Sequence, residues 1–480
     1  MTPVRPVAVI VLAAGGGTRM RSAIPKVLHA IGGRSLLDHC LVAAHGLEPD
    51  RLAVVVGHGR DRVEPHLCEV DPGVTVVVQD RQLGTGHAVQ VALEALRPLD
   101  EGVVVVTYGD VPLQTTSMLA GLVAAHAAAA NAVTILTASL PSPFGYGRVV
   151  RDSSGAVAGV VEEKDATESE RAIREVNSGI FAFDAAVLRS LLERVGRDNA
   201  AGEMYLTDVV ALARADGHRV GAQVTDDAWQ IEGANTRSQL SALGRELNRR
   251  VLEHWMDAGV EVVDPLTTWV DVTVQLAPDV SLKPGVQLHG STRVDTGAVI
   301  GPDTTLTDVE VGADSRVVRT HGSQAVLGPG STVGPFAYLR PGTVLGSAGK
   351  IGTFVETKNA SIGADAKVPH LSYVGDAEIG EGTNIGAGTI FANYDGVSKS
   401  RTTVGKHCKT GSDNVFVAPV AIGDGAATGA GTVVRRNVPP GALAVSSGPQ
   451  RHIDGWVPRK RPGTAAARAA ETALDEEASE

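Results

Sequence analysis

The pattern of hydrophobic and polar positions changes its period about halfway along the chain. Across residues 1–235, short apolar runs alternate with segments of helical period such as His87–Leu96 and Ser117–Ala130. The apolar runs are Val7–Leu12, Leu52–Val56, Val74–Val78, Val103–Thr107 and Val133–Leu136. Runs this short and this apolar predict buried strands, and their alternation with helices predicts βαβ units in a mostly parallel sheet. Ligands of such sheets bind beyond the carboxyl ends of the strands.

Residues 236–258 are predicted to form a helix that connects two architectures. Its apolar positions recur at helical spacing on one face, at Leu240, Leu243, Leu247, Val251, Leu252, Trp255 and Met256. The opposite face is charged and carries Arg245, Glu246, Arg249, Arg250 and Glu253.

From about Pro265 onward, apolar residues recur every six positions. The clearest series runs through Leu327, Val333, Leu339, Leu345 and Ile351. Glycine often follows the apolar residue, as in Ile300-Gly301 and Ile362-Gly363. A hexapeptide repeat is typical of a left-handed parallel β-helix, in which the apolar residue fills the interior and three hexads complete a coil. Residues 392–402 break the repeat and are predicted to form a loop on one face, where solenoid proteins often bind ligands.

These patterns predict four parts of the chain. Residues 1–235 form an α/β Rossmann-like domain, and residues 236–258 form the connecting helix. Residues 259–457 form the β-helix. Residues 458–480 are rich in alanine and glutamate and are predicted to be disordered.

Composition narrows the functional class. The 480 residues include 43 Lys and Arg against 54 Asp and Glu, a net charge of −11, which argues against bulk nucleic-acid binding. Three cysteines, with no CxxC pair, exclude a disulfide framework and favour the cytoplasm. No apolar stretch has the roughly 18 residues of a membrane-spanning helix. The first apolar run ends in three glycines and is interpreted as a strand rather than a signal peptide.

The first group of candidate chemical residues follows the first strand. The segment Leu12–Met20 (LAAGGGTRM) is a glycine-rich turn, and Lys26 lies shortly after it. Backbone N–H groups in such a turn approach phosphates closely, and Arg19 and Lys26 would neutralise the charge of a triphosphate. A purely structural turn is the alternative.

Other polar residues follow further strands. Asp110 comes directly after the run Val103–Thr107 and suits Mg²⁺, which takes one or two carboxylates together with substrate phosphates. A turn or cap role is the alternative for Asp110. Gln79, Gln82 and the Leu83–Gly86 turn follow another strand and are candidates to read a base edge.

The second group lies on the predicted β-helix. Arg340, Glu356, Lys358, His370 and Tyr373 fall within 34 positions of one another, where a scaffold turn would favour Gly, Asn and Ser. Residues about 18 apart lie one above the other in successive coils, so Arg340 and Lys358 place two cations on one face as a phosphate clamp. A lone histidine is more often structural than catalytic, but its polar neighbours favour a catalytic role for His370.

Several motifs together resemble a known family. LAAGGGTRM, QLGTGHA, YGDVP, GYGR, VEEKDA, NSGIF and IEGAN are similar to the motifs of sugar-1-phosphate nucleotidylyltransferases. With the hexapeptide domain, the chain resembles the bifunctional N-acetylglucosamine-1-phosphate uridylyltransferases/glucosamine-1-phosphate acetyltransferases over roughly residues 7–457. The resemblance implies synthesis of UDP-N-acetylglucosamine for peptidoglycan precursors: acetyl transfer from acetyl-CoA first, then uridylyl transfer from UTP with release of pyrophosphate.

The resemblance also assigns residues to the first reaction site. Arg19 and Lys26 would act on the phosphates, and Asp110 and Asn235 would hold one or two Mg²⁺ ions. The implied nucleotide and sugar-nucleotide residues are Leu12, Ala13, Ala14, Gly15, Lys26, Gln79, Gly84, Thr85, Tyr108, Gly109, Asp110, Gly147, Glu162, Asn177 and Asn235.

For the second reaction, the resemblance makes His370 the general base, oriented by Glu356 and Asn393. Arg340, Lys358, Tyr373 and Asn384 would bind the sugar phosphate, and Ala387, Asn393, Tyr394, Ser412 and Ala430 would line the acetyl-CoA site. Ser447 stands where many relatives have an arginine that contacts coenzyme A, so Arg435, Arg436 or the segment 459–461 is a candidate substitute.

The resemblance further implies a cytoplasmic homotrimer that acts on small molecules, with neither nucleic acid nor membrane as partner. Two alternatives remain open. One is a monofunctional nucleotidylyltransferase with a structural or regulatory β-helix, and His370 with its two cations speaks against it. The other is a regulatory homologue without activity, against which Arg19, Lys26, Asp110 and Asn235 speak.

Overall fold

The structure is a computed structural model that describes residues 4–446, 448 and 450–478. The chain divides between Arg293 and Val294 into two compact units.

The first unit is built on a mixed sheet with the strand order β11-β7-β10-β6-β1-β4-β5. Its strands are β1 (Ala8–Ala13), β4 (Arg51–Val56), β5 (Thr75–Val78), β6 (Val103–Tyr108), β7 (Val133–Ser139), β10 (Glu175–Asp184) and β11 (Val220–Thr225), with β8 (Gly147–Arg151) and β9 (Val157–Val161) beside β10. All five predicted strands are present. β1 runs parallel to β4 and β6, whereas β10 runs antiparallel to β6 and β7. The predicted mostly parallel sheet is therefore present, with β10 reversed relative to its neighbours.

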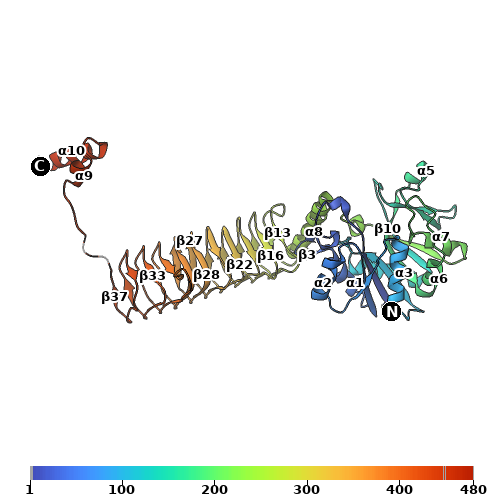
Figure 1. Ribbon diagram of the computed structural model, residues 1–480, viewed down its shortest axis with the longest axis horizontal. Helices are drawn as coiled ribbons and strands as arrows, with labels where there is room; N and C mark the ends of the chain where they lie inside the picture. Colours follow the sequence, from blue (N-terminus) through green and yellow to red (C-terminus); the bar gives the residue numbers. More distant parts are fainter. Residues whose placement is uncertain (1–3, 447, 449, 479–480) are drawn as a thin grey trace. The chain divides into compact units, whose positions relative to one another are not determined.

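Helices cover both faces of this sheet (Figure 1). They are α1 (Leu36–His45), α2 (Arg60–Val70), α3 (Thr85–Ala95), α4 (Thr116–Ala128), α5 (Glu168–Arg171), α6 (Ala185–Leu192) and α7 (Asp208–Ala215); the short elements are η1 (Thr18–Met20), η2 (Lys26–Leu28), β2 (Ala30–Ile31), β3 (Arg34–Ser35) and η3 (Ala228–Ile231). In β1, Ile10 and Leu12 join one hydrophobic cluster while Val9 and Val11 join the other. A strand buried on both faces explains why its sequence is a continuous apolar run.

The predicted connecting helix is α8 (Arg237–Asp257), which begins at the Thr236 cap. Its Asn248 side chain donates to the Thr268 carbonyl (2.8 Å) and accepts from the Val270 N–H (3.0 Å). The first unit also contains the first coils of parallel strands: β12 (Glu261–Val262), β13 (Trp269–Val270), β14 (Gln275–Leu276), β15 (Ser281–Leu282) and β16 (Gln287–His289).

The second unit continues as a parallel β-helix, as the hexapeptide repeat predicts. The unit boundary falls within β17 (Arg293–Val294). The strands of the second unit after β17 are β18 (Val299–Ile300), β19 (Thr305–Thr307), β20 (Glu310–Val311), β21 (Arg316–Val317), β22 (Thr320–Ser323), β23 (Ala325–Leu327), β24 (Thr332–Val333), β25 (Ala337–Leu339), β26 (Thr343–Leu345), β27 (Lys350–Thr353), β28 (Glu356–Ile362), β29 (Lys367–His370), β30 (Tyr373–Ile379), β31 (Ile390–Ala392), β32 (Thr402–Val404), β33 (Val415–Val417), β34 (Val420–Ile422), β35 (Ala427–Thr428), β36 (Val433–Val434) and β37 (Leu443–Ala444).

Its coils stack one on the next (Figure 1), and the predicted hexad residues from Leu327 to Ile351 are buried in the interior. Glycine is needed at some corners because neighbouring coils approach closely. A Cβ at Gly346 would lie 2.5 Å from the Ala364 nitrogen, and one at Gly363 would lie 2.6 Å from the Glu381 nitrogen. Of the predicted loop 392–402, residues 393–401 lie between β31 and β32, and its two end residues belong to those strands.

The last part of the chain holds two helices, α9 (Trp456–Lys460) and α10 (Ala465–Glu477). Thr464 caps α10 through the Ala467 N–H. The composition of residues 458–480 predicts disorder, and helices of this length are marginal in water without tertiary packing. The behaviour of this segment in solution stays a prediction.

Candidate functional site

A cavity of about 370 Å³ opens at the carboxyl ends of β1, β5 and β6. Ligands of parallel sheets bind at this edge, where the loops that follow the strands lie. Eleven of the nucleotide-site residues implied by the resemblance line it, namely Leu12, Ala13, Ala14, Gly15, Lys26, Gln79, Gly84, Thr85, Tyr108, Asp110 and Asn235. The strands therefore gather in one cavity residues that are separated by as many as 223 positions in the chain.

One ammonium group joins two of the oxygen donors in this cavity. The Lys26 Nζ donates to Asp110 Oδ2 and, at 3.2 Å, to Asn235 Oδ1. Lys26 and Asp110 each expose 13% of their side chains. The carboxylate and amide oxygens thus converge on a position that already holds a positive charge, as a cation site requires.

Backbone contacts fix these three residues. Gly17 has a φ of +57°, and a Cβ there would lie 2.6 Å from Cβ of Lys26, so glycine is required for Lys26 to approach the turn. The Ala234 N–H donates to the Asp110 carbonyl (3.0 Å), and the Asn235 N–H donates to Gln239 Oε1 (3.0 Å). Asn235 is therefore held by the loop of Asp110 and by the first turn of α8.

Two glutamines border the glycine-rich turn. Gln79 donates to the Gly84 carbonyl (3.1 Å), and Gln82 donates to the Ala14 carbonyl (2.6 Å). Gly84 has a φ of +111°, and a Cβ there would lie 2.5 Å from the Met204 carbonyl oxygen. Thr85 accepts from the Leu206 N–H (3.0 Å). The turn is thus packed against the segment before α7, which carries Glu203 into the cavity.

Gly147, Glu162 and Asn177 form a second cluster, outside the residues that line the cavity. β8 pairs Gly147 with Asn177, and a Cβ at Gly147 would lie 3.3 Å from Glu162 Oε2. Tyr108 connects this cluster with the cavity, because a Cβ at Gly179 would lie 2.4 Å from its ring. Burial raises the pKa of Glu162, although the Thr207 hydroxyl donates to it (3.0 Å) and opposes this shift.

Glu163, which follows Glu162 in the chain, has a different role. Glu163 accepts from the buried Arg148 guanidinium (2.7 Å) and from the Gly145 N–H (3.1 Å). The Arg148 bond holds the pKa of Glu163 below its usual range. In the motifs GYGR and VEEKDA, Arg148 and Glu163 therefore hold the loop together, which leaves Glu162 to face the cluster.

Two expected residues lie apart from the cavity lining. Arg19 lies in η1 with an exposed side chain, and Gly109 donates its N–H to the Leu12 carbonyl (3.0 Å) behind the cavity. Sequence reasoning left Glu203 out altogether. It lies in a loop far along the chain, and no local motif marks it.

The second candidate site lies on one face of the β-helix. The register that pairs Leu339 with Thr357 places Arg340 and Lys358 in adjacent coils. Glu356 pairs with Tyr373 on the next coil and accepts from the Arg340 guanidinium (2.8 Å). This bond raises the pKa of Arg340. The stacking therefore brings four of the expected residues together.

His370 ends β29, and its side chain is exposed. We had expected Glu356 and Asn393 to orient this imidazole. Among the described residues its ring has no hydrogen-bond partner; Glu356 bonds to Arg340, and Asn393 donates to Asp376. The orienting role of Glu356 and Asn393 stays a prediction.

The residues expected to line the acetyl-CoA site follow one corner of successive coils. The Ala387 carbonyl accepts from the Asp413 N–H (2.7 Å), and the Ser412 carbonyl accepts from the Gly431 N–H (2.8 Å). These bonds place Ala387, Ser412 and Ala430 in one column. Asn384 lies between Lys367 and Lys409 as an isolated bridge. Tyr394 is exposed in the loop 392–402 and donates to the Gly396 carbonyl (2.6 Å).

Sequence reasoning missed Lys399 and Asp376 at this site. Lys399 lies in the same loop, and its pKa is lowered because its ammonium group lies beside that of Lys358. Asp376 accepts from Asn359 (2.8 Å) and from Asn393, and these bonds outweigh burial and lower its pKa. The basic run 399–401 in the interrupting loop was the available signal. Ser447 lies outside the described residues.

No helix in the described part of the chain has both the length and the apolar character needed to cross a membrane.

Comparison with known proteins covers nearly the whole chain. Residues 9–175 match the MobA-like NTP transferase domain. The Bifunctional protein GlmU of Kineococcus radiotolerans is 63% identical over 474 residues, which is 99% of this chain and 96% of that protein. The proteins of the same name from Pseudarthrobacter chlorophenolicus and Streptomyces avermitilis are 60% and 58% identical, over 99% and 98% of this chain and 97% and 98% of theirs. The chain therefore belongs to the GlmU family of bifunctional enzymes, with uridylyltransferase and acetyltransferase activities in the synthesis of UDP-N-acetylglucosamine.

Proposed function

We propose that the cavity of the first unit is the uridylyltransferase site and that the β-helix face around His370 is the acetyltransferase site. The observation that carries the first assignment is the convergence of Lys26, Asp110 and Asn235 in a cavity at the carboxyl ends of the strands. The second assignment rests on the group of Arg340, Lys358 and Lys399 around Tyr373, which is cationic enough to hold a sugar phosphate. Acetyl transfer comes first.

At the uridylyltransferase site, an oxygen of the sugar phosphate attacks the α-phosphorus of UTP in line, and pyrophosphate leaves. Both reactants are anions, so the site supplies positive charge and orientation rather than a protein nucleophile. Lys26 stabilises the phosphate charge from within the cavity, and Arg19 does so from the exposed turn. The Leu12–Gly15 backbone and Gln79 hold the nucleotide, while Glu162 and Asn177 hold the sugar.

Mg²⁺ is part of this proposal, as one or two ions. Asp110 and Asn235 would hold it, and they suit it because their oxygens already converge on a cationic group. Bound Mg²⁺ would neutralise the developing phosphate charge. Among the described residues no group of three or more His, Cys, Asp or Glu side chains is placed to hold a metal ion. Substrate phosphates would complete the coordination, which is usual for this ion.

At the acetyltransferase site, His370 takes a proton from the amine of glucosamine-1-phosphate as that nitrogen attacks the thioester carbonyl of acetyl-CoA. A carbon–nitrogen bond forms, and the coenzyme A thiolate leaves. Arg340, Lys358, Tyr373 and Asn384 hold the sugar phosphate. The corner that bears Ala387, Ser412 and Ala430 lines the coenzyme site, where a backbone N–H would stabilise the tetrahedral oxyanion.

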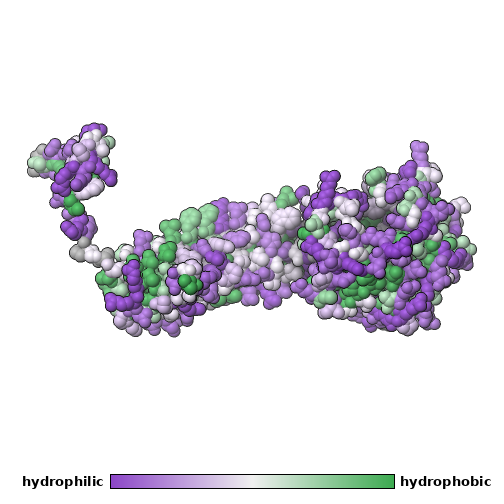
Figure 2. All heavy atoms as spheres, viewed as in Figure 1, coloured by the Kyte–Doolittle hydropathy of each residue, from purple (hydrophilic) through white to green (hydrophobic). Residues whose placement is uncertain are grey.

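We also propose a cytoplasmic homotrimer. Cys40, Cys68 and Cys408 are free thiols, which supports a reducing compartment. The β-helix carries exposed aromatic side chains that a neighbouring subunit would cover: the rings of Phe336 and Phe354 stack at 5.5 Å, and they are 52% and 59% exposed. Figure 2 shows patches of hydrophobic residues on the visible face of the β-helix. A solution mass near three times 49.5 kDa would bear out the trimer.

A mass-resolved product assay tests both assignments together. With glucosamine-1-phosphate, acetyl-CoA and UTP, we expect UDP-N-acetylglucosamine, coenzyme A thiol and pyrophosphate. Without acetyl-CoA, UDP-N-acetylglucosamine should not form. A second assay supplies N-acetylglucosamine-1-phosphate and UTP directly. If the first mixture releases no thiol while the second still yields UDP-N-acetylglucosamine, the monofunctional alternative is correct.

The raised pKa of Glu162 gives this site a pH dependence. An ionised Glu162 accepts a hydrogen bond from the sugar, and its protonation begins above the ordinary value of 4.5. We therefore expect the KM for N-acetylglucosamine-1-phosphate to rise as the pH falls through the mildly acidic range. Glu162→Gln should raise this KM about 10-fold or more at neutral pH, because a bond to a charged group is lost.

The decisive measurement is the KM for N-acetylglucosamine-1-phosphate of wild type and of Glu162→Gln at several pH values. The substrate phosphate also titrates with a pKa of about 6, so the KM of the glutamine variant should vary with pH in this range, but less than that of wild type. If wild type and variant follow the same pH profile, Glu162 does not contact the sugar.

A further inference from the structure

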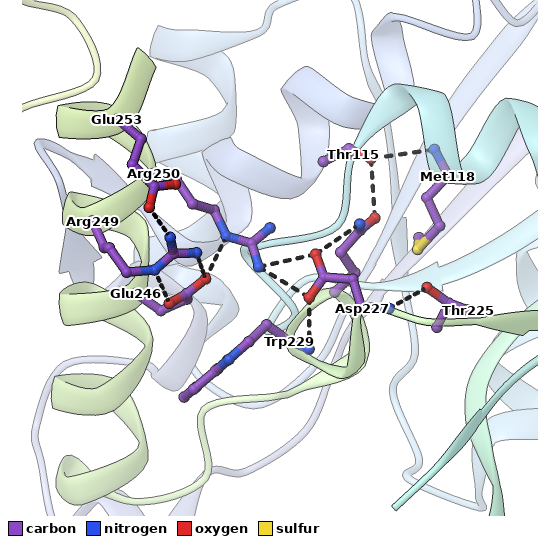
Figure 3. Close-up of polar contacts among 10 residues, drawn as sticks. Thr115, Met118, Thr225, Asp227, Trp229, Glu246, Arg249, Arg250 and Glu253 are labelled. Carbon is purple, nitrogen blue, oxygen red and sulfur yellow. Dashed lines mark hydrogen bonds and ion pairs between the residues drawn. The ribbon is translucent and has the colours of Figure 1, made fainter. Parts of the chain in front are cut away.

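A chain of ion pairs connects α8 with the loop before it. The Arg250 guanidinium lies between Glu246 on α8 and Asp227 on that loop (Figure 3). Its Nε donates to Glu246 Oε1 (2.8 Å), and its Nη2 donates to Asp227 Oδ1 (3.0 Å). Glu246 is 8% exposed and also accepts from Arg249 at 2.7 and 2.8 Å. A nearly buried carboxylate is thus held by two arginines, and one of them reaches across to the loop.

From Asp227 the hydrogen bonds continue to the two segments that carry the candidate metal ligands. Asp227 caps η3 by accepting from the Trp229 N–H (3.2 Å), and it accepts from the Gln230 side chain (3.0 Å). Gln230 in turn accepts from the Thr115 hydroxyl (3.0 Å). Asn235 comes four residues after η3 ends, and Thr115 comes five residues after Asp110.

Charge on this network keeps Asp227 ionised. Burial alone would raise the pKa of Asp227, but the bonds from Gln230 and Arg250 outweigh it and lower that pKa. The bond from Arg249 is the main cause that lowers the pKa of Glu246. Without Arg250, Asp227 would lose the cation that fixes it to α8, and the loop that ends in Asn235 would lose a restraint.

We propose that Arg250 is a positioning residue for the proposed metal site and that it acts through Asp227, Gln230 and Thr115 to hold Asp110 and Asn235 at the spacing a divalent cation needs. The inference rests on the proposed uridylyltransferase function. Groups behind metal ligands commonly change metal affinity by about 10–100-fold when they are removed. The bond from the Ala234 N–H to the Asp110 carbonyl remains in the variant, so a partial rather than complete loss is expected.

The chain offers a matched control in the neighbouring arginine. Arg249 also binds Glu246, but its other partner is Glu253 rather than Asp227. Arg249→Met therefore removes an ion pair of the same helix and the same carboxylate without touching the loop. Arg250→Lys retains the charge but not the two-pronged geometry and should restore part of the effect.

The experiment measures Mn²⁺ binding by electron paramagnetic resonance in the presence of UDP-N-acetylglucosamine. We expect Arg250→Met to weaken Mn²⁺ binding about 10–100-fold and Arg249→Met to leave it within about twofold of wild type. In the uridylyl transfer assay, Arg250→Met should need more Mg²⁺ for half-maximal rate and regain most of its kcat at saturating Mg²⁺. The kcat regained at saturating Mg²⁺ reports that the first unit is folded, and acetyl transfer by the same preparation reports the same of the β-helix.

Equal Mn²⁺ affinity in wild type and Arg250→Met would overturn the positioning role. So would equal weakening in both arginine variants, because that result would indicate general damage to α8. If wild type binds no Mn²⁺, or binds it equally well after Asp110→Ala, the metal assignment within the proposed function fails and takes this inference with it.

Discussion

Acetyl transfer falls by about 10²–10⁴-fold when His370 is replaced by alanine, because the amine then loses its general base as it attacks the thioester. We expect the loss in kcat rather than in the KM for glucosamine-1-phosphate, since the proposed binding residues for the sugar phosphate, Arg340 and Lys358, are retained. Uridylyl transfer is unaffected, because its residues belong to the first unit. Thiol release from acetyl-CoA and pyrophosphate release from UTP measure the two activities on one preparation.

A second exposed histidine of the β-helix serves as the control. His407 is exposed and lies outside the residues proposed for the site. His407→Ala should leave both activities within about twofold of wild type. A similar small effect for His370→Ala would show that His370 is not the base, and the search would move to water or to Tyr373.

Removal of the Asp110 carboxylate has the largest expected effect on the other reaction. Asp110→Ala should lower uridylyl transfer by about 10³-fold or more, because metal stabilisation of phosphate charge is worth several kcal/mol. It also leaves the Lys26 ammonium, 13% exposed, without the carboxylate that it contacts. Some loss of thermal stability in the first unit should therefore accompany the loss of rate. Pyrophosphate release and thermal unfolding measure the two effects.

Asp100→Asn is the matched control for this change. Asp100 is an exposed carboxylate of the same unit, and it pairs with Arg189 at 2.7 Å. A surface ion pair contributes about 0–1 kcal/mol to stability, so neither rate nor stability should change much. Uridylyl transfer at wild-type rate in Asp110→Ala would refute the metal role of Asp110.

Much of the fold could be predicted because each architecture has its own period. The strands around β1 are continuous apolar runs since helices cover both faces of the sheet, and the six-residue repeat has no helical counterpart. The direction of β10 could not be predicted. Its apolar segment Ile180–Phe183 resembles that of any buried strand, and only pairing with β6 and β7 fixes it as antiparallel.

The candidate site could be predicted in part for a related reason. Gly15 and Asp110 follow β1 and β6, which are adjacent and parallel, so topology alone brings them together. Glu203 and Lys399 depend instead on long loops whose course no local pattern fixes. The resemblance supplied Asn235, but the ion pairs that join α8 to the loop before it could be seen only in three dimensions.

The interrupting loop of the β-helix has a consequence for how this surface can vary. Ala377 pairs with Thr402, 25 positions later, whereas Thr402 pairs with Val420 at the usual 18. The extra residues therefore leave the ladder in register, because they depart from a corner and return to it without entering the interior. The length and composition of this loop therefore do not affect how the coils stack. Changes in the length or charge of this loop should therefore leave the stacking of the coils unchanged.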